Sequence, residues 1–179
     1  TENVGLIIIN NLYDLSIFKR IDKRVKVWMI KRKPSGINPL PILKLNLFLL
    51  KLDYFCLHCH NNELIKLIKL NKKPVYLTLH CNGINSNVLS KYSILFAISD
   101  AVRKDVLTRS AIDSIVIYNG IKTSELKEMP NVNDNEIRII QVSRLEHYEK
   151  GQHILLKALH ILKQKNKLGN IKCNFIGEG

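Results

Sequence analysis

Acidic residues, aromatic residues and cysteines are all scarce in this chain. It has 15 Asp and Glu against 28 Lys and Arg, which gives 179 residues a formal net charge of +13 at pH 7. This imbalance favours an anionic partner: nucleic acid, an anionic membrane surface or a phosphorylated substrate. Aromatic residues make up only 7% of the chain, and it shows neither an aromatic RNA-binding strand motif nor a zinc finger. We therefore expect no nucleic-acid partner.

The few cysteines and the lack of a long apolar run indicate the compartment. Four cysteines lack the spacing of a disulfide scaffold, so we expect reduced thiols in a cytoplasmic protein. The most apolar stretch, 39–57, is interrupted by Lys44, Lys51 and Asp53 within the length that a membrane span requires. Residues 17–33 (IFKRIDKRVKVWMIKRK) are the stretch densest in cations and contain the single Trp. They fit either peripheral contact with the anionic inner face of a membrane or a solvated surface around a strand at 25–30.

Apolar runs and amphipathic stretches alternate along the chain, which predicts an α/β doubly wound parallel sheet. Ser99 is a suitable N-cap for the helix that begins at Asp100. We expect strands at 4–9, 25–30, 54–58, 75–79, 92–98 and 115–118, and helices at 12–21, 42–52, from about 63 to 70, and 100–108.

The stretch 137–179 predicts a parallel strand-helix-strand unit with a right-handed crossover. Its strands are 137–142 and 171–176, and its helix presents one apolar face, made of Ile154, Leu155, Ala158, Leu159 and Leu162. Ligands of such sheets bind at the carboxyl ends of the strands. Arg144 and Lys150 follow the first strand, and a Gly-Glu-Gly turn follows the second. Two cations, a helix N-terminus and a glycine turn therefore predict a phosphate site.

The same residues resemble a known family. VSRL at 142–145, Lys150-Gly151 before a Leu/Ala-rich helix and FIGEG at 175–179 resemble the start of the C-terminal domain of family-4 retaining glycosyltransferases, which have the GT-B fold. The resemblance implies two Rossmann-like doubly wound parallel sheets, the second truncated, with Arg144 and Lys150 holding the diphosphate of a nucleotide sugar. Ser143 stands where the family has Gly, and it is small and still offers a backbone N–H. The resemblance also implies a donor-binding loop made of Ser143, Gly177, Glu178 and Gly179.

The resemblance extends back to about Tyr54. AISDAVR at 97–103 and IYNGI at 117–121 look like the close of the family's N-terminal domain, and VYLTLH at 75–80 is similar to its strand ending in a cleft histidine. This implies a catalytic role for His80, facing the donor sugar or the acceptor. His60 is a second candidate for the acceptor side of that cleft.

The expected domains are an N-terminal, acceptor-side Rossmann-like domain at 1–121, an interdomain linker at 122–136 and the beginning of a nucleotide-sugar-binding domain at 137–179. The chain starts on Thr1 rather than Met and stops on a glycine just after a strand, so we expect an internal part of a longer protein. In the family, a glutamate pair beyond the Gly-Glu-Gly turn binds the donor. We therefore predict that this stretch has no competent active site by itself.

We expect no metal and no cofactor, since the nucleotide sugar is a substrate. Two cysteines and two histidines can form a zinc site. If 54–60 is extended, however, alternation directs Cys56 and His58 to one face and Cys59 to the other. The spacing matches no standard zinc module, and no Asp-x-Asp pair is present to hold a metal.

Two classes of function follow. The first is a glycosyltransferase that moves a sugar, with retention, from a UDP- or GDP-linked donor to a glycan or lipid-linked acceptor; Arg144 and Lys150 would neutralise the leaving diphosphate. The alternative is a non-catalytic basic module that binds phosphates, nucleic acid or a membrane surface.

Overall fold

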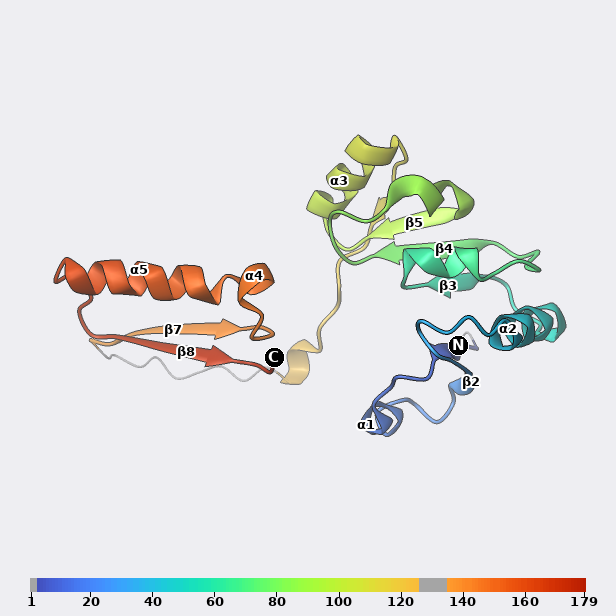
Figure 1. Cartoon of the computed structure of the whole chain (residues 1–179), viewed down its shortest axis with the longest axis horizontal. Helices are drawn as coiled ribbons and strands as arrows, with labels where there is room; N and C mark the ends of the chain where they lie inside the picture. The colour runs from blue at the N-terminus through green and yellow to red at the C-terminus, as the bar shows by residue number, and fades with distance from the viewer. Residues whose placement is uncertain (1–2, 126–134) are drawn as a thin grey trace. The chain divides into compact units, whose positions relative to one another are not determined.

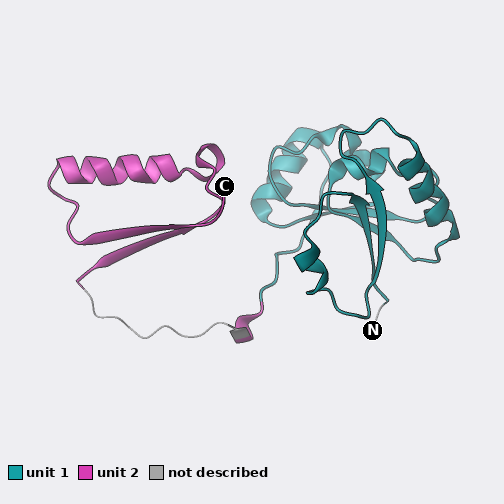
Figure 2. Ribbon diagram, turned by 60° about the horizontal axis from the view of Figure 1, so that its bottom comes forward, with its two compact units in different colours: residues 1–121 teal, residues 122–179 magenta. Residues whose placement is uncertain are grey.

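The computed structural model divides the chain into two compact units (Figure 2), which are Thr1–Ile121, here unit 1, and Lys122–Gly179, here unit 2. It describes residues 3–125 and 135–179. Most of the expected linker, 122–136, lies outside the described residues. The part before residue 126 contains one short 3₁₀ turn, η3 (Thr123–Glu125).

Strands and helices alternate along the described chain, and the strand pairs are all parallel. This confirms the expected α/β fold with parallel sheets. Unit 1 contains β1 (Gly5–Asn10), α1 (Leu15–Phe18), β2 (Lys26–Arg32), α2 (Leu40–Lys51), β3 (Leu57–Cys59), η1 (Asn62–Lys66), β4 (Val75–Leu79), η2 (Ser86–Lys91), β5 (Ile94–Ala97), α3 (Asp100–Ser110) and β6 (Ile115–Val116). Unit 2 contains β7 (Ile137–Val142), α4 (His147–Lys150), α5 (Gln152–Gln164) and β8 (Ile171–Ile176).

The core of unit 1 is built on the sheet β3-β4-β5-β6. β4 alternates between buried Val75, Leu77 and Leu79 and half-buried Tyr76 and Thr78, so its two faces differ in burial. α3 packs against this sheet through its buried valines, Val102 and Val106. The expected cap is confirmed, because the Ser99 hydroxyl accepts a hydrogen bond from the Val102 N–H.

The strands of unit 1 pair in two sheets rather than one. β1 and β2 form a separate parallel pair, whereas β3 to β6 lie side by side in chain order. The doubly wound order is therefore not seen among the hydrogen bonds of the described strands. The helix α2 connects the two sheets along the chain, and it packs on β2 through the rings of Phe48 and Trp28, whose centroids are 5.2 Å apart.

Two expected helices are much shorter in the structure. The helix expected at 12–21 is the single turn α1, which Asp14 caps. The helix expected to reach Leu70 is the 3₁₀ turn η1, which ends at Lys66. The N–H groups of Lys69 and Leu70 donate to the side-chain oxygen of Asn46 in α2, at 2.6 and 2.9 Å. A helical continuation would have directed these N–H groups to carbonyls one turn earlier, so the long-range contact replaces it.

Unit 2 consists of the parallel pair β7-β8 with α5 along one face of it (Figure 1). The expected bounds of both strands are confirmed. The inner side of α5 carries buried Gln152 and half-buried Leu155, Leu159 and Leu162. Ile154 and Ala158, also expected on this face, are exposed, Ile154 by 63%. Gly151, in the left-handed conformation, is the C-cap of α4 and the N-cap of α5.

Candidate functional site

The structure brings two of the sequence-predicted residues, His60 and His80, together. His60 directly follows β3, and His80 directly follows the neighbouring parallel strand β4. His60 Nδ1 lies 3.0 Å from His80 Nε2, which is a hydrogen bond between two rings. A neutral imidazole has one donor and one acceptor nitrogen, so one of these two atoms carries the proton and the other accepts it. The pair therefore cannot keep this bond when both rings are doubly protonated.

A third histidine joins the pair, and sequence analysis had not assigned it to the site. The ring of His58 stacks on that of His60, with centroids 4.9 Å apart and planes at 9°. His58 Nε2 also lies 2.7 Å from the Thr78 hydroxyl. The spacing His-x-His on a strand places both rings on one face, and this is the signal that could have found it.

In this histidine cluster (His58, His60 and His80), the surroundings favour the neutral form of His58 and of His60. Loss of contact with water lowers the pKa of His60, and the nearby His80 lowers it further. The pKa of His58 is lowered for the same reasons, first by desolvation and then by His60 and His80. A charged ring at either of these two positions is solvated less well and meets like charge, so His58 and His60 resist protonation.

Cys59 points away from the histidine cluster. It is buried in the core of unit 1, where desolvation raises the pKa of its thiol to about 11. This agrees with the alternation expected along 54–60. Within residues 3–125 and 135–179, no group of three or more His, Cys, Asp or Glu side chains could hold a metal ion. That the function needs no metal stays a prediction.

The second candidate region is the loop that follows β7. The Ser143 N–H donates to the Ile176 carbonyl and the Leu145 N–H to the Glu178 carbonyl, both at 3.0 Å. The turn after β8 therefore packs on this loop. A Cβ at Gly177, whose φ is +154°, would come within 1.8 Å of the Ser143 carbonyl oxygen, and a Cβ at Gly179 within 2.9 Å of the Leu145 backbone. These glycines permit the close approach, and the Ser143 N–H expected to face a ligand is used by β8.

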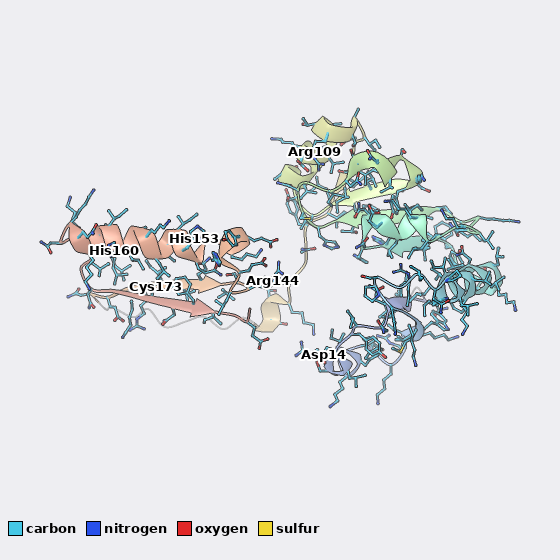
Figure 3. The ribbon with its side chains drawn as sticks, in the orientation of Figure 1. Asp14, Arg109, Arg144, His153, His160 and Cys173 are labelled. Atoms are coloured by element: carbon cyan, nitrogen blue, oxygen red, sulfur yellow. The ribbon has the colours of Figure 1, made fainter. Side chains whose placement is uncertain are left out.

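Arg144 lies at the end of unit 2 where the strands finish (Figure 3), and carboxylates already bind its guanidinium. Its Nη2 lies 2.9 Å from Glu149 and its Nη1 3.3 Å from Glu146. The side chain of Arg144 is 66% exposed, so these ion pairs are weak and open to exchange. Lys150 is exposed as well and has no carboxylate partner in the described part of the chain. The two cations and the two carboxylates of this loop therefore cancel in formal charge.

Gln152 organises this loop, and sequence analysis had overlooked it. Its Nε2 donates to the Arg144 carbonyl at 2.7 Å and to the Ser143 hydroxyl at 3.1 Å. The residue is 8% exposed, and its Oε1 is buried without a hydrogen-bond partner. Gln152 is the first residue of α5, so the loop is fixed to the helix N-terminus. A glutamine in the first turn of an otherwise apolar helix face was the available signal.

Comparison with known proteins assigns no family. No protein-family model matches the sequence, and a search of curated proteins finds no match.

Proposed function

We propose that this chain is part of a retaining glycosyltransferase of the GT-B type, with unit 2 binding the diphosphate of a UDP- or GDP-linked sugar. The observation that carries the proposal is the parallel unit β7-α5-β8, whose strand ends bear Arg144, Lys150 and the Gly177–Gly179 turn. Strand ends of parallel sheets and helix N-termini are where phosphates bind. The resemblance of the same residues to family-4 glycosyltransferases supports this choice of phosphate ligand.

In this proposal Arg144 changes partners when the donor binds. Its exposed guanidinium exchanges Glu149 for a phosphate oxygen, and a doubly charged diphosphate is the stronger acceptor. Lys150 supplies a second cation as charge develops on the leaving group. Gln152 acts on the donor only indirectly, since it holds the backbone carbonyl of Arg144 and thereby positions the loop.

The histidine cluster supplies the acceptor side of the proposal. In the tautomer in which His80 Nε2 donates to His60 Nδ1, the Nδ1 atom of His80 is free to accept a proton from a hydroxyl group. The acceptor would be a glycan or lipid-linked sugar hydroxyl.

The experiment is release of UDP or GDP from nucleotide sugars by the whole protein, with binding of UDP and GDP to this chain measured by calorimetry. Loss of one charge-assisted hydrogen bond weakens binding by about 10–100-fold, so the Arg144→Ala, Lys150→Ala double variant should lose binding and release. Glu149→Gln should bind more tightly, because it frees Arg144. Lys157→Ala, an exposed cation on α5, is the matched control and should behave as the parent.

Two results would overturn the proposal. The first is nucleotide binding that the double variant leaves unchanged. The second is no release with any donor together with salt-sensitive binding to nucleic acid or anionic vesicles, which is the behaviour of a non-catalytic basic module.

A further inference from the structure

The helix α2 exposes an apolar face that nothing in the described part of unit 1 covers. Leu40, Leu43, Leu47 and Leu50 are between 46% and 58% exposed. Their spacing of three or four residues places them along one side of the helix. Ile37, just before the helix, is fully exposed as well. An unbroken row of exposed leucines differs from the scattered apolar residues of an ordinary surface and marks a contact face.

The opposite side of α2 is fixed, so this leucine face cannot turn inward. Leu45, Asn46 and Leu49 are buried at 2–3% exposure. Asn46 Nδ2 donates to the carbonyls of Ile42 and Leu67, both at 2.8 Å, and its Oδ1 accepts from Lys69 and Leu70. All the hydrogen-bonding capacity of this amide is used, and it locks the rotation of the helix.

The charge around the leucine face has one sign. Residues 23–52 contain eight Lys and Arg and no Asp or Glu. At 100° per residue, Lys44 and Lys51 lie within about 60° of Leu47 and on the same exposed arc. A face with leucines in the middle and lysines along its margin is complementary to an anionic lipid surface, where leucines enter the acyl boundary and lysines meet the headgroups.

We propose that α2 docks in the plane of an anionic phospholipid bilayer through this leucine face (Leu40, Leu43, Leu47 and Leu50, with Lys44 and Lys51 at its margin). The twelve residues of α2 lie on the membrane rather than across it; among the described helices, none is long and apolar enough to cross a bilayer. The contact belongs to the face of α2 and not to the cation-rich stretch 17–33 as a whole, because 26–32 is the strand β2, whose Val27 to Ile30 are half-buried. This inference does not depend on the proposed transferase activity.

The test is co-sedimentation of the chain with two kinds of vesicle, phosphatidylglycerol mixed with phosphatidylcholine and phosphatidylcholine alone. The parent should sediment with the anionic vesicles only. Each lysine near an anionic surface contributes about a fivefold gain in binding, so Lys44→Gln with Lys51→Gln should weaken binding by about 25-fold. Leu43→Ser with Leu47→Ser should weaken it by at least ~10-fold, because the inserted apolar area is lost.

A matched control separates the leucine face from general hydrophobicity. Leu12→Ser with Leu107→Ser removes two exposed leucines of the same unit outside α2, and it should bind as the parent does. Trp28 is the single tryptophan and packs on Phe48 of α2. Its fluorescence emission therefore verifies that each variant is folded. Equal binding by the parent and the Leu43, Leu47 variant would overturn the inference. So would the absence of vesicle binding together with a dimer that the same leucine substitutions dissociate, because a second copy would then cover the face.

Discussion

Asn46→Ala is expected to destabilise unit 1 by about 3 kcal/mol, because this one side chain joins α2 to the segment after η1. Asn46 is 3% exposed and makes four hydrogen bonds. The Ile42 carbonyl keeps its helical partner, the backbone N–H four residues later, after the substitution. The Lys69 N–H, the Leu70 N–H and the Leu67 carbonyl lose the partner that the structure gives them.

The magnitude follows from these three backbone groups. Each group left without a partner in a buried site costs about 1–3 kcal/mol. The lower end applies, because the hydrogen bonds are only partly buried and water can replace some of them. Three groups at about 1 kcal/mol each give the expected total.

The assay is urea unfolding followed by the emission of Trp28, which lies on β2 and packs on α2 through Phe48. Because the chain has a single tryptophan, the signal reports on unit 1 alone. With a slope of about 2 kcal/mol per molar urea, the midpoint should fall by about 1.5 M. Asn82→Ala is the control, since Asn82 is exposed and its midpoint should move by little. A shift for Asn46→Ala no larger than that of Asn82→Ala would refute the reasoning.

Two further predictions concern the candidate sites. Gly177→Ala should open the turn after β8, because the new Cβ would meet the Ser143 carbonyl, and amide hydrogen exchange at Leu145 should rise by at least ~10-fold. Gly120→Ala is the control and should change nothing, because no atom lies near its Cβ. Unchanged exchange at Leu145 in Gly177→Ala would count against the close approach. The lowered pKa values of His58 and His60 mean that stability is present above the pKa of an unfolded histidine and is lost as the pH falls through the folded values. Unit 1 should therefore weaken as the pH falls below the ordinary histidine pKa of about 6.5. NMR titration should also show a higher pKa for His58 in His60→Gln, and an unmoved value would contradict the proposed coupling.

Local sequence signals were sufficient where the structure depends on neighbours along the chain. The bounds of β4, β7 and β8 agree with expectation, since each is an apolar, β-rich run ended by polar or glycine residues. The start of α3 follows from the Ser99 cap. His60 and His80 could be placed at one sheet edge because both follow neighbouring parallel strands.

The rest depends on contacts between distant residues. The expected helix up to Leu70 fails because an asparagine about 23 residues earlier takes the N–H groups that would have continued it. The separate pairing of β1 with β2 likewise joins segments that are distant in the sequence, which no local pattern contains. In the loop after β7, the sequence displays Glu146 and Glu149 beside Arg144, but only the fold shows that both reach its guanidinium.

The net positive charge of the chain lies mainly outside the loop after β7, which carries Arg144 and Lys150. The charges of Arg144 and Lys150 are equal in number to those of Glu146 and Glu149, so the loop after β7 adds nothing to the total of +13. Residues 23–52 hold eight of the 28 Lys and Arg and none of the 15 Asp and Glu, so this stretch alone contributes +8. Long-range attraction to an anionic surface depends on such unbalanced charge, whereas a small phosphate ligand needs only two or three well-placed donors. The composition that favours an anionic partner thus points to unit 1 and the leucine face, and the case for a nucleotide sugar depends on the local geometry of β7, α5 and β8.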